Sequence, residues 1–457
     1  MSEQSTRDER PARRRRLDPE VRRRQVVVSA REVFTELGAT GTRMRDIAAR
    51  AGITVPYLFR IFGSRDDLYR EAIQQPLDQL AHDVVHATRE LSGRSDIEQS
   101  EKLRRFHRLC MTHFIALAPL LRAQILPREA GEPWFHTELL FPSWQDVVAT
   151  VISDVTGWKV ESIHLDVMVH ALMGLYIELA FESDLEQVPL DVDRTADQLV
   201  RMFAPRHHAD PAGEAGTPAT RAAATDESPG PDPARAENAD PDDDESARGR
   251  LSRAQRRESI LVAARALFLE AGLSGARSKD LADRAQITEG FLYQHFSSKE
   301  EIYELAVEVP TEQALIELAA DIERICQGEH GSTFLQALNE RCLRFFVDHG
   351  ATLTTALLSD LERSRRFYRE RVAVHFDGVG AAIAAKMGYD ADVIDPELAR
   401  RAIMGCQWGV SIALRTRYPT SDLSAIARHL TRLFISGVKG GMAAPHGAHM
   451  VADQLSG

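Results

Sequence analysis

The strongest constraint on this chain is that much of its sequence occurs twice. Phe34 matches Phe268, which lies 234 positions further on. The same spacing, without a gap, pairs Gly38 with Gly272, Gly41 with Gly275, Asp46 with Asp280, Leu58 with Leu292, Phe62 with Phe296 and Tyr69 with Tyr303. Later matches shift slightly, to 232 positions at Cys110 and 231 at Gly174. Duplication followed by short insertions and deletions produces this pattern, so we expect two copies of one fold.

A segment of different composition separates the two copies. Residues 205–247 are rich in Pro, Ala, Gly, Asp and Glu, lack apolar periodicity and carry most of the chain's net charge of −12. Such a composition cannot bury enough apolar surface to fold, so we expect a disordered linker. The predicted organisation of the 457 residues is a basic disordered arm (1–20), a first repeat (21–204), the linker (205–247), a second repeat (248–440) and a flexible tail (441–457).

Nearly everything outside the linker has the spacing of an amphipathic helix. Apolar residues recur three and four positions apart, as at Val26, Ala30, Val33 and Phe34. No alternating pattern typical of a β-strand lasts long enough to compete with this one. The sequence therefore predicts an all-α protein with two helical repeats.

Several classes of protein find no support in the sequence. The four cysteines form no CxxC pair, which favours buried thiols in a reducing cytoplasm over a disulfide framework. The Arg-rich start lacks the apolar stretch of a signal peptide, and no apolar run is long enough to span a membrane. The chain also lacks a phosphate-binding glycine loop, a nucleophile elbow and an HExxH motif. We expect a cytoplasmic protein that is not an enzyme, makes no membrane contact and uses no metal or cofactor.

The start of the second repeat has the pattern of a helix-turn-helix. A supporting helix is expected from about Arg253 to Ala271, ended by Gly272 in a left-handed conformation. A short helix follows over 278–285, and after a tight turn Thr288 is a good N-cap for the next helix, as Thr54 is for the matching helix of the first repeat. Two short helices joined by such a turn behind a supporting helix read the major groove of DNA. We place the helix-turn-helix units at about 21–72 and 253–306, followed by larger helical domains at 73–204 and 307–440.

The residues of these units resemble the TetR family of transcriptional regulators. Residues 285–300 read AQITEGFLYQHFSSKE, close to the family's recognition pattern A-G-V-S-x-G-x-L-Y-x-H-F-x-x-K-E. Residues 51–66 read AGITVPYLFRIFGSRD and fit more loosely, whereas residues 42–48, TRMRDIA, fit well. The resemblance implies binding to double-stranded operator DNA, with a helical domain that holds a small-molecule pocket and a dimer surface.

The resemblance also implies which residues face DNA. Hydroxyl and cationic side chains are expected at phosphates, where they position the protein without reading sequence. Side chains early in the second short helix are expected to read bases, with Arg60 suited to guanine and Gln294 to adenine. The arginine-rich segments 13–16, 22–24 and 248–257 are candidate further contacts, with plain solubility as the alternative. The full DNA-facing set is Thr42, Arg43, Arg45, Thr54, Val55, Pro56, Tyr57, Phe59, Arg60 and Arg65 in the first repeat, and Arg277, Lys279, Thr288, Glu289, Gly290, Phe291, Tyr293, Gln294, His295 and Lys299 in the second.

Each repeat departs from the family's pattern at different positions. Phe59 stands where the family has a Tyr, Ile61 where it has His, and Pro56 where it has Gly. In the second repeat, Ala276 replaces a Thr and Gln286 replaces the Gly of the turn. Both units could bind DNA, or one could have become mainly structural.

The larger helical domains offer candidates by residue type only. Apolar and aromatic side chains with a few polar groups line small-molecule pockets. The pocket candidates are Trp134, Trp144, His170, Tyr176, Phe345 and Trp408, with ordinary core packing as the alternative. The resemblance implies that the last two helices of each repeat, about 163–182 with 194–203 and 397–416 with 421–437, form the dimer surface, with packing of these helices inside their own domain as the alternative. Gly174 and Gly405 suit a close approach of two helices there.

Two units in one chain predict an intramolecular pseudo-dimer that binds an asymmetric DNA site. A homodimer of two chains with four units is the alternative. The expected function is sequence-specific regulation of transcription, with repression relieved by an unknown small-molecule effector as the default. The alternative function is an architectural protein that binds DNA with weak sequence preference.

Overall fold

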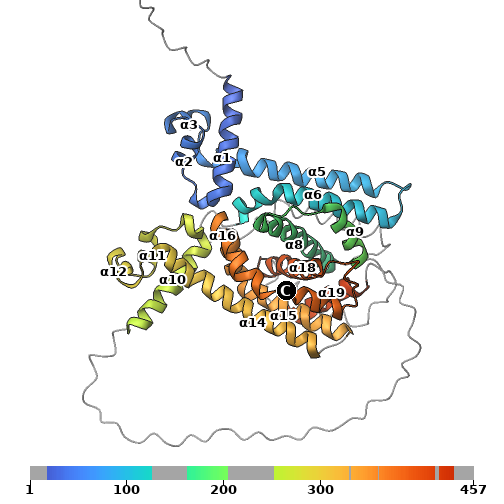
Figure 1. Ribbon diagram of the computed structural model, residues 1–457. Helices are drawn as coiled ribbons and strands as arrows, with labels where there is room; N and C mark the ends of the chain where they lie inside the picture. The colour runs from blue at the N-terminus through green and yellow to red at the C-terminus, as the bar shows by residue number, and fades with distance from the viewer. Residues whose placement is uncertain are drawn as a thin grey trace, which may run out of the picture.

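The secondary structure is helical throughout the part of the chain that can be described. The computed structural model describes residues 18–125, 162–203, 252–328, 331–358, 360–416 and 421–436. Every element assigned within these ranges is a helix, which confirms the all-α prediction (Figure 1). The predicted linker and tail lie outside these ranges, as do Trp134, Trp144 and all but the last three residues of the predicted arm. Among the described helices, none is both long enough and apolar enough to cross a lipid bilayer.

The first repeat begins with a supporting helix and three short helices, and we call these four helices the first head. Longer helices then pack beside the first head. The bounds are α1 (Pro19–Gly41), α2 (Met44–Arg50), α3 (Val55–Ile61), α4 (Arg65–Tyr69), the π-helical turn η1 (Arg70–Gln74), α5 (Gln75–Ser92), α6 (Gln99–Ile125), α8 (Ser162–Glu186) and α9 (Val192–Phe203).

The second repeat has the same order of elements as far as its second long helix, which is where the described part of the first repeat is interrupted, and its first four helices form the second head. Its π-helical turn after the head falls at the position that matches the one in the first repeat. The bounds are α10 (Arg253–Gly275), α11 (Ser278–Arg284), α12 (Glu289–His295), α13 (Lys299–Tyr303), η2 (Glu304–Glu308), α14 (Val309–Gly328), α15 (Gly331–Leu358), α16 (Leu361–Phe367), η3 (Tyr368–Val372), η4 (Ala373–His375), α17 (Val379–Lys386), α18 (Pro396–Thr416) and α19 (Leu423–Ser436).

Matching residues make matching contacts inside the two heads. Phe34 packs edge-on against Tyr69 with ring centroids 5.1 Å apart, and Phe268 packs in the same way against Tyr303 at 5.0 Å. All four rings are buried, and burial of one such side chain contributes about 2 kcal/mol to folding. The two copies therefore share their core as well as their sequence pattern.

Both supporting helices bend at the same glycine. Gly38 in α1 has φ 73° and ψ 168°, and Gly272 in α10 has φ 65° and ψ 178°. The positive φ expected at Gly272 is confirmed, but its ψ lies outside the left-handed helical region. The chain therefore bends at this residue and continues for one further helical turn, to Gly275, rather than ending its helix there.

The two repeats pack against each other through α8 and α18, which lie in the middle of the larger helical bundle (Figure 1). The two helices run antiparallel and cross at glycines. A Cβ atom added to Gly174 would lie 2.1 Å from the carbonyl oxygen of Gly405 and 2.7 Å from Cα of Gly409. The expected close approach at Gly174 and Gly405 is confirmed, because no side chain would fit at this crossing.

The two heads also touch each other, at the last turns of α1 and α10 (Figure 1). The hydroxyl of Thr40 donates a hydrogen bond to the carbonyl of Ala271 at 2.6 Å. A Cβ atom added to Gly41 would lie 2.6 Å from Cβ of Ser274. The heads are thus held next to each other at one side of the molecule.

Candidate nucleic-acid interface

The turn between the two short helices has the same backbone conformation in each head. Its central residue has a positive φ, which is 64° at Gly52 and 55° at Gln286. After the turn, the side-chain oxygens of Thr54 and Thr288 accept hydrogen bonds from the backbone N–H three residues on, at 3.4 and 3.2 Å. The expected N-caps are therefore confirmed, and each fixes the start of the helix that would enter the groove.

The two recognition helices, α3 and α12, bury few side chains and expose large ones. Only Leu58 and Leu292 are buried in them. Phe59 is 44% exposed, Phe291 36% and Tyr293 42%, which is unusual for large aromatic side chains. Of the other predicted residues, Thr54, Pro56, Arg60, Thr288, Glu289, Gly290 and Gln294 are exposed, and Val55, Tyr57 and His295 are half-buried. These side chains form one outer face on each head.

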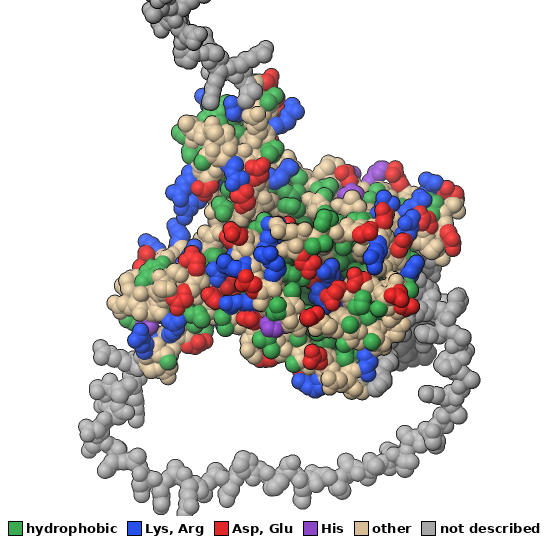
Figure 2. Space-filling model, viewed as in Figure 1, with side chains coloured by type: hydrophobic (Ala, Val, Ile, Leu, Met, Phe, Trp, Pro, Cys, Tyr) green, Lys and Arg blue, Asp and Glu red, His purple; other side chains and the backbone are tan. Residues whose placement is uncertain are grey.

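Cationic side chains flank the first short helix of each head. Arg43 and Arg45 are exposed at α2, and Arg277 and Lys279 are exposed at the matching positions of α11. Arg277 forms a two-point ion pair with Asp280 at 2.7 and 2.9 Å, yet its side chain stays 69% exposed. Figure 2 shows blue side chains along the outer edge of both heads. Charges placed beside a groove-reading helix suit phosphate contacts.

Thr42 lies inside the first head and not on its outer face. Its side chain is 3% exposed, and its hydroxyl donates to the carbonyl of Gly38 at 2.7 Å. Ala276 holds the matching position in the second repeat and is also buried. This geometry argues against the expected DNA contact of Thr42, because the hydroxyl is the only donor of its side chain and already bonds to a carbonyl at the end of α1.

Arg65 and Lys299 point back toward the supporting helices. Arg65 donates to the carbonyl of Ala39, and Lys299 donates to the carbonyl of Leu273 at 2.8 Å, which is the matching position. Burial lowers the pKa of Lys299, and the nearby positive charge of Arg43 from the other head lowers it further. Both side chains therefore contact carbonyls at the C-terminal ends of α1 and α10 in this structure, and their expected phosphate contacts stay a prediction.

Two arginines from the arginine-rich segments are used inside the heads. Arg23 forms an ion pair with Glu71, and Arg257 forms one with Glu301 at 3.0 Å. Each guanidinium also lies over a core phenylalanine ring, at 4.3 and 4.2 Å from its centroid. These two arginines brace the recognition helices from behind, and segment 13–16 lies outside the described residues.

The outer faces differ at one pair of hydroxyl groups. The hydroxyl of Tyr293 lies 2.5 Å from that of Ser278, so the start of α11 and the middle of α12 are linked at the surface. Phe59 and Met44 hold the matching positions in the first head. Only the second head therefore offers hydroxyl donors at this point.

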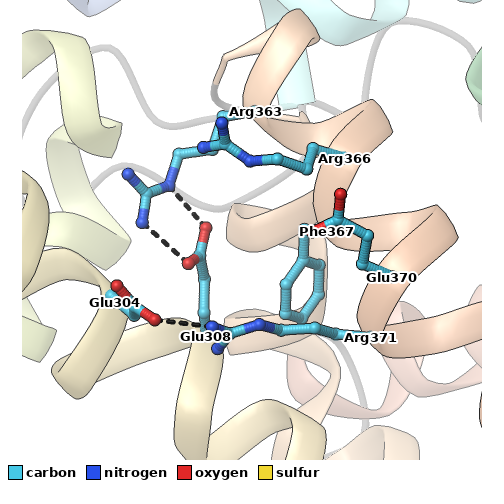
Figure 3. Close-up of a pocket in the computed structure, with 7 residues that line it drawn as sticks. All are labelled: Glu304, Glu308, Arg363, Arg366, Phe367, Glu370 and Arg371. Atoms are coloured by element: carbon cyan, nitrogen blue, oxygen red, sulfur yellow. Dashed lines mark hydrogen bonds and ion pairs between the residues drawn. The ribbon is translucent and has the colours of Figure 1, made fainter.

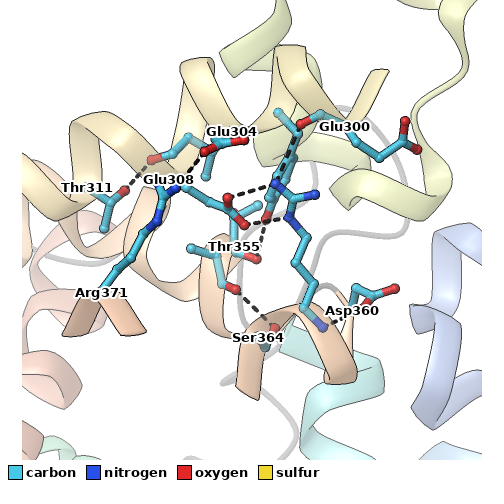
Figure 4. A network of polar contacts seen from close by, with 12 residues as sticks. Glu300, Glu304, Glu308, Thr311, Thr355, Asp360, Ser364 and Arg371 are labelled. Carbon is cyan, nitrogen blue, oxygen red and sulfur yellow. Dashed lines mark hydrogen bonds and ion pairs between the residues drawn. The ribbon is translucent and has the colours of Figure 1, made fainter. Parts of the chain in front are cut away.

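A charged joint connects the second head to its larger domain (Figure 4). Arg363 in α16 forms a two-point ion pair with Glu308 in η2, at 2.5 and 2.7 Å, and Arg371 in η3 pairs with Glu304 at 2.5 Å. In the first repeat, Arg70 and Gln74 hold the positions of the two glutamates. This joint is therefore a feature that the second repeat does not share with the first.

A cavity of about 210 Å³ lies at the same joint (Figure 3). Its wall is charged on most sides, which suits water or a charged ligand better than an apolar one. None of the four predicted pocket residues that the structure describes contributes to it. The lining residues are Glu304, Glu308, Arg363, Arg366, Phe367, Glu370 and Arg371.

The predicted pocket residues that the structure describes lie in the packed core. The hydroxyl of Tyr176 is 2.8 Å from Nδ1 of His107, and the indole of Trp408 donates to Thr354 at 3.1 Å. His170 and Phe345 are buried as well. These positions favour core packing, the alternative interpretation, for all four described candidates.

Comparison with known proteins finds a family match on both heads. The family described as "Bacterial regulatory proteins, tetR family" matches residues 26–72 and again residues 260–306. Each match covers most of the supporting helix, all three short helices that follow it and the start of the π-helical turn. The duplicated match agrees with the internal repeat.

Individual relatives match over short stretches. The HTH-type transcriptional activator FasR of Mycolicibacterium smegmatis is 38% identical over 74 residues, which is 16% of this chain and 34% of that protein. The HTH-type transcriptional repressor KstR2 of the same species is 43% identical over 51 residues, which is 11% of this chain and 25% of that protein. The chain thus spans about a third or less of the curated relatives that it matches.

A solved structure gives a broader but weaker likeness. The TetR family transcriptional regulator PfmR of Thermus thermophilus is 22% identical, with a TM-score of 0.31, and the likeness covers 40% of this chain and 99% of that one. The two family matches, each on a complete helix-turn-helix, show that this chain carries the DNA-binding module of the TetR family of bacterial regulatory proteins twice.

Proposed function

We propose that this protein is a sequence-specific DNA-binding regulator of transcription whose two repeats act as an intramolecular pseudo-dimer. The observation that carries the proposal is the pair of exposed recognition helices, α3 and α12, on two heads that one chain holds together. Dimeric helix-turn-helix proteins present two such helices to successive turns of the major groove. Here both helices belong to one chain, so one chain would suffice for one operator.

The two heads would divide their contacts in the same way but read different bases. Because the outer faces of α3 and α12 differ, the proposed operator is asymmetric. Phosphate contacts are proposed for Arg43, Arg45 and Thr54 in the first head and for Arg277, Lys279, Thr288, Tyr293 and His295 in the second. Base and groove contacts are proposed for Val55, Pro56, Tyr57, Phe59 and Arg60 in the first head and for Glu289, Gly290, Phe291 and Gln294 in the second.

Regulation by a small-molecule effector forms the finer part of the proposal. We expect repression that the effector relieves; KstR2 is named a repressor, although FasR is named an activator. The joint at Arg363 and Glu308 supports a coupling of this kind, because a shift of α16 would be passed directly to the second head. A reporter gene behind the selected operator tests the sign: transcription should rise when the protein's own gene is deleted.

The decisive experiment is selection of bound sequences from random DNA, combined with the mass of the complex. We expect one asymmetric motif bound by one chain. Arg60→Ala should relax the preference in one half of the motif, and Gln294→Ala should relax it in the other, each by about 1–3 kcal/mol. Glu90→Ala, on the exposed surface of α5, serves as the control. A palindromic motif bound by two chains would refute the pseudo-dimer.

The architectural alternative predicts a different result in the same assay. Binding would then fall steeply with salt while all sequences bound about equally well, because phosphate contacts would dominate. Enrichment of no motif at any salt concentration would refute the sequence-specific regulator and favour that alternative.

A further inference from the structure

We propose that a buried charged cluster between α8 and α18 restricts each repeat to pairing with the unlike repeat. This inference rests on the proposed pseudo-dimer and adds the rule by which its two halves choose each other. The cluster consists of Glu182 from the first repeat with Arg400, Arg401 and Tyr368 from the second.

The cluster is centred on one carboxylate. Glu182 is 2% exposed, and Arg400 donates to it at 2.9 Å while Arg401 forms a second ion pair with it. The hydroxyl of Tyr368 donates to the same carboxylate at 2.7 Å. Arg401 reaches on to Glu186 of α8 at 3.2 Å. Across the interface, the carboxylates thus come from the first repeat and their donors from the second, and buried charges of this kind are tolerated only when they are paired.

The backbone of the interface is nearly two-fold symmetric, but its charges are not. The matching position of Glu182 in α18 is Ala413, and the matching positions of Arg400 and Arg401 in α8 are Val169 and His170. Every contact of the cluster therefore exists once, at one end of the crossing, and has no counterpart at the other end.

A pair of two first repeats would lose these contacts at both ends. Each Glu182 would face Val169 and His170 of the other copy and would have no arginine beside it. Burial and the adjacent Glu182 already raise the pKa of Glu178, and the two arginines oppose that effect. Without them, the carboxylates would be left buried and unpaired.

Steric fit also disfavours a pair of first repeats. Glu178 occupies the position that matches Gly409. A Cβ atom at Gly409 would lie 2.1 Å from the carbonyl oxygen of His170. Two first repeats therefore could not cross as closely as α8 and α18 do, because each would bring a side chain to a place that admits only hydrogen.

A pair of two second repeats would fail for the opposite reason. Its crossing would contain only glycines, so the helices could approach, but Arg400 and Arg401 of each copy would face Ala413 of the other. Arg400 is 7% exposed, and a guanidinium cannot lose its charge at ordinary pH. Arg400 would keep only Glu397 of its own helix, at 2.7 Å, and both arginines would lose the buried carboxylate of Glu182, which would oppose this pair.

A second set of contacts between the repeats favours the same choice. Asp184 of α8 accepts from Arg365 of α16 at 2.9 Å. Arg122 of α6, which is 2% exposed, pairs with Asp184 at 2.7 Å and donates to the carbonyl of Leu357 in the other repeat at 3.0 Å. Arg415 holds the position that matches Asp184, so a like pair of second repeats would place cation near cation.

The test uses the whole chain with a protease site inserted between residues 205 and 247. After cleavage, unfolding in urea and refolding together, the masses of the pairs are read by native mass spectrometry. We expect pairs of unlike repeats only. Random pairing would make about half of all pairs like pairs, and that result would overturn the proposal.

A variant without the cluster sharpens the test. Glu182→Leu, Arg400→Leu and Arg401→Leu together replace the charges by apolar groups of similar size, a change that buried ion pairs often tolerate. We expect some pairs of second repeats to appear in this variant, fewer than random pairing would give, because Arg365 and Arg415 would still oppose them. As a control, Arg94→Leu with Asp96→Leu removes an exposed ion pair far from the crossing, and this variant should still form only pairs of unlike repeats. If the cluster variant folds and still forms only unlike pairs, that result would contradict the role of the charges. If the variant does not fold, the masses from the unmodified cleaved chain still show whether pairing is restricted to unlike repeats.

The result is separable from the proposed function. Failure of the intact chain to select a DNA motif would refute the regulator but would leave the pairing masses unchanged. Random pairing of the cleaved repeats would refute the rule even if the intact chain bound one asymmetric operator.

Discussion

The two heads are alike inside and different outside. Phe34 and Phe268 fill the same place in their cores, and Arg31 and Arg265 donate to matching carbonyls, at 3.0 and 2.7 Å. On the outer faces, however, Arg60 in the first head corresponds to Gln294 in the second. Packing keeps the interior residues fixed, because a change of one methylene group there already alters stability. The side chains of the outer face lie outside the core, so they can change and with them the bases that each head would contact.

The larger domains repeat this comparison with polar groups in the core. His107 and Tyr176 form a buried pair in the first repeat, and Asn339 and Gln407 form one at the matching positions of the second, with the amide of Gln407 donating to Asn339 at 2.6 Å. Both repeats therefore keep a buried polar contact at this place but build it from different residues. Only the histidine of the first repeat can change its charge near neutral pH.

The largest expected effect breaks the comparison at the helix crossing. Gly409→Val should destabilise the protein by about 3 kcal/mol, because its Cβ would overlap the backbone of α8. Glu178→Val changes the matching position, where a side chain is already present, and should cost less than about 1 kcal/mol. Urea unfolding of both variants measures the difference. Equal losses of stability in the two variants would contradict the conclusion that only the Gly409 side of the crossing excludes a side chain.

Acid should destabilise the first repeat more than the second. Burial lowers the pKa of His107 to about 3, from the usual value of 6.5. In the unfolded chain His107 then binds a proton near neutral pH, whereas in the folded chain it stays neutral. The free energy of unfolding therefore falls as the pH drops below 6.5. The loss should reach about 2 kcal/mol by about pH 5.

Two variants isolate this histidine from the other titrating groups. His107→Asn gives the first repeat the residue that the second repeat has at position 339, and should remove the extra loss between neutral and acid pH. His82→Asn changes an exposed histidine and serves as the control. The same pH dependence in His107→Asn and the unmodified protein would refute the assignment.

Much of each head could be predicted from the sequence because its signals are local. Thr54 and Thr288 cap their helices as expected, since an N-cap depends on only a few neighbouring residues. Gly174 and Gly405 were recognisable as sites of close approach because a helix with so small a residue can come near another. The repeat itself supplied the equivalence of the two halves.

The contacts that depend on side-chain direction or on distant partners could not be predicted. Thr42, Arg65 and Lys299 lie beside the DNA-reading helices in sequence, yet all three turn toward helix ends in the interior. Glu182 meets Arg400 across 218 positions of the chain. Residue type alone does not show such a pairing, because most glutamates and arginines of this chain are ordinary surface charges.

The hydroxyl at Tyr293 offers a smaller test of the outer faces. Tyr293→Phe should weaken operator binding by about 1 kcal/mol, because one donor to a phosphate is lost while the ring remains. Phe59→Tyr adds the hydroxyl to the first head and should strengthen binding by less, since Met44 cannot orient it as Ser278 orients Tyr293. Dissociation constants measured by fluorescence anisotropy at one fixed salt concentration compare the two. Unchanged affinity in both variants would place this position away from the DNA backbone.

The smallest expected effect concerns the turn that both heads share. Gln286 adopts a φ of 55° that costs a residue with a side chain about 1 kcal/mol, whereas Gly52 adopts a φ of 64° without strain. Gly52→Gln should therefore destabilise the protein by about 1 kcal/mol, and nothing within 4 Å of an added Cβ would obscure the effect of the backbone. Gln286→Gly should stabilise the protein by less than that, because glycine also loosens the unfolded chain. If the two turns share one conformation, thermal unfolding should shift the Tm of the two variants in opposite directions. Shifts in the same direction would show that the side chain of Gln286 stabilises its head by contacts that glycine cannot make.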